Sequence, residues 1–147
     1  MGDQPVDDGG VRRTSAPSAT PFTKRVHVMK ILIVDENRTM RRITRHLLRQ
    51  LGYEDVVEVS DGEAALAAMR AQRIDLVIAD ANTEPMSGLE LLQWVRYDAG
   101  LKDTPFVMLV MDDRSEKIIS IREAGVSAYL VRPFTADTLK QTLDYFV

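Results

Sequence analysis

The run Ile31-Leu32-Ile33-Val34-Asp35-Glu36 decides the fold of this chain, because four apolar residues in a row are followed at once by two acids. A strand that is buried on both faces of a parallel sheet reads as a continuous apolar run. The same pattern returns at Leu76-Val77-Ile78-Ala79-Asp80, where a second apolar run ends in a single acid. The two runs therefore predict two interior parallel strands with acids at their carboxyl ends.

These acids form a candidate metal site. Ligands of an open α/β sheet bind outside the carboxyl ends of the strands, so two neighbouring strands would bring Asp35, Glu36 and Asp80 into one crevice. Carboxylates without cysteine or histidine make an oxygen site that suits a hard cation such as Mg²⁺. The alternative for the adjacent pair is the N-cap of the next helix, where an acid is favourable anyway. A helix cap would explain one of the two adjacent acids. It would not explain why both of them stand opposite Asp80 on the neighbouring strand.

Composition narrows the class of protein. The 147 residues suffice for one domain with a hydrophobic core, and 45% hydrophobic and 28% charged residues are typical of a globular protein. The sequence has no cysteine, which excludes a disulfide framework and fits a cytoplasmic location. The net charge of −3 gives no reason to expect nucleic acid binding. No apolar run approaches the roughly 20 residues of a membrane span, so we expect no membrane partner.

The chain divides into a tail and one domain. Residues 1–28 are rich in Gly, Pro, Ser and Thr without apolar periodicity, and we predict a disordered N-terminal tail there. Residues 29–147 form the predicted folded domain. Hydrophobic patterning in it predicts strands at 31–34, 56–59, 76–79, 106–110 and 128–131, and helices at 38–51, 62–71, 89–97, 116–124 and 136–146.

Five strand–helix repeats indicate βαβ units around one parallel sheet with right-handed crossovers. We predict a doubly wound α/β fold of the flavodoxin-like type, with strand order 2-1-3-4-5, since this order places strand 31–34 beside strand 76–79. No glycine-rich phosphate loop follows the first strand, so neither a dinucleotide-binding fold nor a P-loop is supported.

One face of the first predicted helix is strongly basic. A face without acids lacks i,i+4 partners and repels itself. Such a face is ordinarily the solvated side of a helix, but guanidinium groups also suit phosphate or carboxylate recognition, so partner docking or anion binding stays open. The face consists of Arg38, Arg41, Arg42, Arg45 and Arg49.

From about residue 29 to 147 the chain resembles a response-regulator receiver domain, and specifically the CheY-like single-domain type. Several motifs carry this resemblance, in the right order and without insertions. They are the acid pair Asp35-Glu36, the run Thr39-Met40-Arg41-Arg42-Ile43, Asp80 at the family's phosphoacceptor position, the loop Pro85-Met86-Ser87-Gly88, and Tyr129 with Arg132-Pro133-Phe134.

The resemblance implies a role in two-component signalling. A histidine kinase or phosphotransfer protein would donate a phosphoryl group to Asp80, with Mg²⁺ bridging. Asp35, Glu36, Asp80 and the backbone carbonyl of Asn82 would hold the metal. The signal would pass to a downstream protein through the surface made by the fourth helix, fifth strand and fifth helix.

Several positions depart from the family pattern. Val110 stands where the family has a Thr or Ser that bonds the phosphoryl group, and Met111 follows where a small residue is usual. Arg132 replaces a lysine with a planar fork that could clamp Asp80 even without phosphate. Glu36 replaces the commoner Asp.

The first hypothesis is therefore a receiver that accepts a phosphoryl group on Asp80. The departures suggest an alternative, a pseudo-receiver that binds a partner protein or an anionic ligand such as a cyclic dinucleotide independently of phosphorylation. A third alternative is a small phosphotransfer or hydrolytic enzyme. The sequence shows no recognisable nucleophile–base pair, so we do not expect an enzyme.

Overall fold

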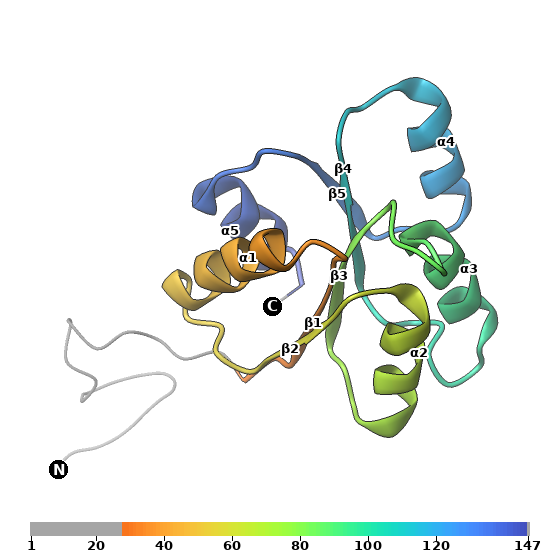
Figure 1. Cartoon of the computed structure of the whole chain (residues 1–147), viewed down its shortest axis with the longest axis horizontal. Coiled ribbons are helices and arrows are strands. Elements are labelled where there is room, and N and C mark those ends of the chain that lie inside the picture. Colours follow the sequence, from red (N-terminus) through yellow and green to blue (C-terminus); the bar gives the residue numbers. More distant parts are fainter. Residues whose placement is uncertain (1–27, 147) are drawn as a thin grey trace, which may run out of the picture.

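Five parallel strands in the order β2-β1-β3-β4-β5 form the centre of the fold, as the sequence predicts (Figure 1). The computed structural model describes residues 28–146, so the predicted tail over residues 1–28 lies outside the described residues except for Val28. The strands are β1 Ile31–Val34, β2 Val56–Val59, β3 Leu76–Asp80, β4 Phe106–Val110 and β5 Ala128–Val131. The helices are α1 Arg38–Gln50, α2 Gly62–Ala71, α3 Gly88–Tyr97, α4 Ser115–Glu123 and α5 Ala136–Asp144.

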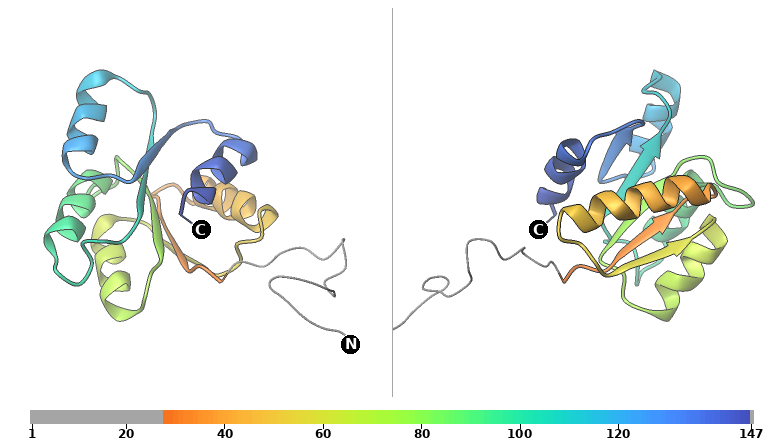
Figure 2. Two further views of the ribbon diagram at one scale, coloured as in Figure 1. Left: turned by 180° about the vertical axis from the view of Figure 1, so that it is seen from behind. Right: turned by 60° about the vertical axis from the view of Figure 1, so that its left-hand side comes forward.

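Helices cover both faces of the sheet. Helices α1 and α5 lie on one face, and α2, α3 and α4 lie on the other (Figure 2). Each layer has its own apolar core, with Leu48 and Leu139 on the first face and Leu66 and Leu91 on the second. Every residue of β1 and β4 is buried, which is the physical reason for their uninterrupted apolar sequences. Burying one such side chain contributes about 1.5–3 kcal/mol.

Side-chain caps fix where the helices begin, and therefore where the loops beside the sheet end. The Asn37 side chain accepts a hydrogen bond from the Met40 amide at the start of α1. Ser87 and Glu90 form a reciprocal capping box at the start of α3. The observed helix ends differ from the predicted ones by two residues at most, because terminal turns are set by these local bonds and not by apolar periodicity.

The loop between β3 and α3 is tied down at two places. The Met86 carbonyl accepts hydrogen bonds from the Thr83 hydroxyl at 2.6 Å and from the Gly62 amide at 3.1 Å. A β-carbon at Gly88 would lie 2.2 Å from the Asp80 carbonyl oxygen, so only glycine allows α3 to start this close to the end of β3.

Arg96 joins α3 to the two loops that precede β4 and β5. Its guanidinium donates to the carbonyls of Gly125, Lys102 and Thr104 and to the Ser127 hydroxyl. These bonds satisfy backbone acceptors in two loops at once. Within residues 28–146, no helix has the length and apolar character that crossing a membrane requires.

Candidate functional site

The parallel register brings the ends of β1 and β3 together. Val34 pairs with Ala79, so Asp35 and Asp80 come next at the same edge of the sheet. On the far side, the Arg132 amide continues the ladder one residue beyond β5 by donating to the Val110 carbonyl at 2.8 Å. The site is therefore built at the carboxyl ends of four neighbouring strands, as the topology predicts.

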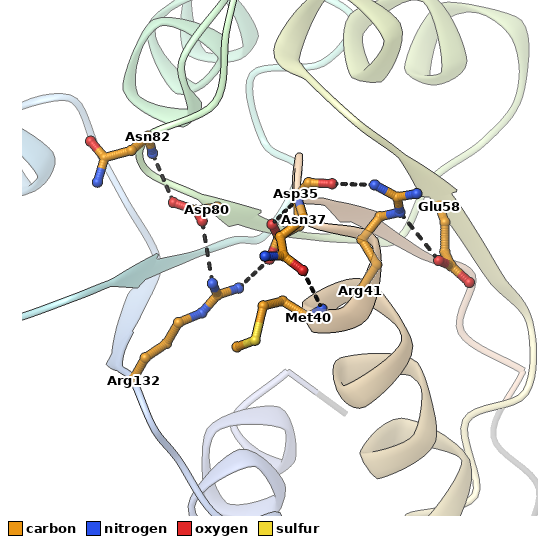
Figure 3. Close-up of polar contacts among 8 residues, drawn as sticks. All are labelled: Asp35, Asn37, Met40, Arg41, Glu58, Asp80, Asn82 and Arg132. Atoms are coloured by element: carbon orange, nitrogen blue, oxygen red, sulfur yellow. Dashed lines mark hydrogen bonds and ion pairs between the residues drawn. The ribbon is translucent and has the colours of Figure 1, made fainter.

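Arg132 reaches across β4 and holds both acids (Figure 3). Its Nη2 donates to Asp35 Oδ2, and its Nη1 lies 3.3 Å from Asp80 Oδ2. The side chains are 1% exposed for Asp35, 10% for Arg132 and 21% for Asp80. The Arg132 Nε is buried and has no hydrogen-bond partner among the described residues. The expected clamp of Arg132 on Asp80 is therefore present, but its fork is shared between two carboxylates.

Each carboxylate uses its second oxygen to order the turn that follows it. Asp35 Oδ1 accepts from the Asn37 amide at 2.9 Å, and Asp80 Oδ1 accepts from the Asn82 amide at 2.8 Å. The Asn82 side chain in turn accepts from Lys117 Nζ at 3.2 Å, which brings a second cation from α4 close to the site. All four carboxylate oxygens of the acid pair are thus engaged within the described structure.

The expected cluster of three converging acids is wrong. Glu36 is exposed and makes no hydrogen bond or ion pair with a described residue. Over residues 28–146, no group of three or more acidic, histidine or cysteine side chains is arranged to hold a metal ion. Asp35 is buried and Glu36 is exposed, at the bend between β1 and the cap of α1 at Asn37. Only Asp35 and Asp80 converge.

The end of β4 provides no hydroxyl group. Val110 is buried in the core beneath α3 and α4. Met111 is 67% exposed, so most of its side chain lies in solvent. Tyr129 is half-buried and packs against the core layer that contains Val110.

Glu58 on β2 is a residue that sequence reasoning missed. It accepts from Arg45 at 2.7 Å and from Arg41 at 3.4 Å, so two of the five α1 arginines have an acidic partner from a neighbouring strand. Arg41 also donates to the Asp35 carbonyl at 2.6 Å and so links α1 to the backbone at the end of β1 (Figure 3). The sequence feature that could have indicated this pairing is Glu58 itself, the one acid in an otherwise apolar strand. The basic helix that it contacts becomes its neighbour only in the tertiary fold.

Four side chains of α1 surround a shallow hollow of about 310 Å³ on the outer surface. The hollow is lined by Arg42, Arg45, His46 and Arg49.

Comparison with known proteins agrees with this architecture. Residues 31–144 match the family model described as response regulator receiver domain. The chain is 46% identical over 116 residues to chemotaxis protein CheY-3 of Vibrio cholerae serotype O1, covering 79% of this chain and 89% of that protein. It is 42% identical over 116 residues to chemotaxis protein CheY of Pseudomonas aeruginosa, covering 79% and 94%.

Solved structures give the same result. The chemotaxis response regulator CheY4 of Vibrio cholerae superposes with a TM-score of 0.75 at 35% identity, covering 82% of this chain and 100% of that one. The receiver domain of a Pseudomonas aeruginosa sensor histidine kinase, with magnesium coordinated in its active-site cleft, superposes with a TM-score of 0.74 at 25% identity, covering 80% and 96%. Nothing in these comparisons supports the alternative of a phosphorylation-independent module. The chain belongs to the response regulator receiver domain family and is a CheY-like receiver of two-component signalling.

Proposed function

We propose that Asp80 accepts a phosphoryl group from a histidine kinase or phosphotransfer protein. The observation that supports this choice is the unequal exposure of the two converging acids. Asp35 is 1% exposed and has no surface to offer a donor protein, whereas Asp80 is 21% exposed at the mouth of the site. Of the two converging acids, only Asp80 combines access from solvent with a nearby cation.

The two oxygens of Asp80 have different roles in this reaction. Oδ1 is fixed by the Asn82 amide at 2.8 Å, whereas Oδ2 lies 3.3 Å from Arg132, longer than the roughly 2.7–2.9 Å of a strong charge-assisted bond. Oδ2 is therefore the oxygen more available for attack on the phosphorus of a phosphohistidine. The O–P bond forms, the P–N bond breaks, and the electron pair returns to the imidazole nitrogen. Arg132 and Lys117 supply positive charge next to the transferred group.

We propose further that Asp35 and Asp80 hold Mg²⁺, with the Asn82 carbonyl as an additional ligand. The two converging carboxylates have the oxygen chemistry that this ion prefers. Their oxygens already meet at one cation, the Arg132 guanidinium, so the pair fits a positive charge at that point. When bound, the metal would neutralise charge on the phosphoryl oxygens. The magnesium in the related Pseudomonas aeruginosa receiver domain supports this assignment.

We place this receiver in the cytoplasm and propose that it signals by contact with a downstream protein through the surface of α4, β5 and α5. Ile119 on α4 and Val131 at the end of β5 are exposed apolar residues on these elements. They give a binding partner apolar area to cover.

A phosphorylation experiment tests the proposal. The full chain is incubated with Mg²⁺ and a small phosphoramidate donor, and the product is resolved on a phosphate-affinity gel. We expect one hydroxylamine-labile phosphoryl group on the wild type and none on Asp80→Asn. Asp112→Asn is the matched control, since Asp112 is an exposed acid in the loop after β4. Undiminished labelling of Asp80→Asn would refute the assignment.

A further inference from the structure

The guanidinium of Arg132 lies at the point where the two candidate metal ligands converge. It bonds Asp35 Oδ2 through one nitrogen and Asp80 Oδ2 through another, so one planar group joins both carboxylates. A lysine ammonium is a compact charge, whereas the arginine fork has fixed donors that match two acceptors at once. The acid pair therefore already has an internal counter-ion.

We propose that Arg132 is a resident cation that a divalent metal ion must displace, and that it thereby sets the metal affinity of this site. The inference rests on the proposed function, because it takes Asp35 and Asp80 as the metal ligands. It goes beyond that function by naming the residue that controls access to them.

Because Asp35 is buried, the Arg132 guanidinium and a divalent metal ion compete for it. A carboxylate oxygen has lone pairs for more than one partner, so a bonded oxygen is not by itself blocked. Asp35, however, is 1% exposed, and its two oxygens are taken by the Asn37 amide and by Arg132. Asp35 therefore offers an entering ion almost no free surface while the guanidinium stays in place.

The positive charge of Arg132 also weakens metal binding. The two carboxylates carry about −2, and the guanidinium reduces this to about −1, so an entering divalent ion meets a weaker attraction and a nearby like charge. Removal of Arg132 restores the full attraction of both acids.

Within residues 28–146, the two acids are the only hydrogen-bond partners of the Arg132 guanidinium. Nε is buried and has no partner among residues 28–146, and within that range the side chain bonds only to Asp35 and Asp80. Withdrawal of the guanidinium would therefore break the two acid contacts and would free Nε to be hydrated.

Calorimetric titration of the full chain with Mg²⁺ tests this competition. We expect Arg132→Ala to bind Mg²⁺ at least tenfold more tightly than the wild type, with Arg132→Lys between the two. The control for general loss of positive charge is Arg114→Ala, since Arg114 is 87% exposed before α4 and contacts Asp112 at 3.7 Å. Its Mg²⁺ affinity should stay within twofold of the wild type.

A second measurement covers the case in which Arg132→Ala does not fold. The Nε–H resonance of Arg132 in the ¹⁵N-labelled wild type should shift during the Mg²⁺ titration, with the midpoint that calorimetry gives. Mg²⁺ binding that leaves this resonance unchanged would overturn the inference. So would Arg132 variants that bind no more tightly than Arg114→Ala, or a complete lack of Mg²⁺ binding. Labelling of Asp80 is assayed separately, so its failure is distinguishable from failure of the competition.

Discussion

Substitution of Arg132 by methionine removes the cation but keeps most of the side-chain volume. Asp35 is then left 1% exposed with no counter-charge, and breaking a buried pair in this way costs about 3–5 kcal/mol. The lost contact with Asp80 adds less than about 1 kcal/mol, because that carboxylate is 21% exposed and water can replace the guanidinium. We therefore expect Arg132→Met to lower the free energy of unfolding by about 3–5 kcal/mol in total.

Urea unfolding followed by circular dichroism measures this loss, with the slope against urea unchanged if only stability is affected. In the double variant with Asp35→Asn, the loss should be about 2–3 kcal/mol smaller than the sum of the two single losses, because the amide carries no charge to leave unpaired. Arg114→Met is the matched control, and it should stay within about 0.5 kcal/mol of the wild type. A loss below about 1 kcal/mol for Arg132→Met, or additive single losses, would refute the assignment of Arg132 as a buried counter-ion.

Three further predictions concern other parts of the structure. Arg96→Ala should lower the free energy of unfolding, measured in urea, by about 2–4 kcal/mol, because four hydrogen-bond acceptors lose their donor. The control is Arg73→Ala, whose side chain is 90% exposed, and it should change the free energy of unfolding by less than about 1 kcal/mol. Gly88→Ala should lower the free energy of unfolding by more than about 2 kcal/mol, because the added β-carbon would lie 2.2 Å from the Asp80 carbonyl oxygen. In the control Gly100→Ala the nearest atom is 3.4 Å from the added β-carbon, and a similar loss for both variants would contradict the close approach at Gly88. Burial raises the pKa of the Tyr53 phenol above its ordinary 10.0, and a neighbouring carboxylate raises it further. Stability from this group is complete below pH 10.0 and is lost as the pH rises through the folded-state value, so urea midpoints should fall more steeply above pH 10.0 in the wild type than in Tyr53→Phe.

The sheet was predictable because its central strands are buried on both faces. In a chain with helical segments between its apolar runs, an uninterrupted run as short as Ile31–Val34 indicates an interior parallel strand. The same reasoning located Asp35 and Asp80 correctly at the ends of neighbouring strands, since strand order alone determines which ends are adjacent.

Side-chain direction was not predictable in the same way. Glu36 follows Asp35 directly, yet it is exposed whereas Asp35 is buried, at the bend that leads to the cap of α1. The pairing of Glu58 with Arg45 joins positions 13 residues apart, and no local period relates a strand residue to a helix residue. Arg132 was expected at Asp80, but its division between two acids depends on how far the side chain extends over β4.

The shared acceptor at Met86 has a mechanical consequence for signalling. One carbonyl receives both the Thr83 hydroxyl and the amide that opens α2, so the segment after Asp80 is fastened to a helix on the far side of the sheet from α1. Any rearrangement of residues 81–87 that moves this carbonyl must either break one of its bonds or pull the first turn of α2 with it. A change in the charge state of Asp80 that displaced this loop would then also displace the first turn of α2.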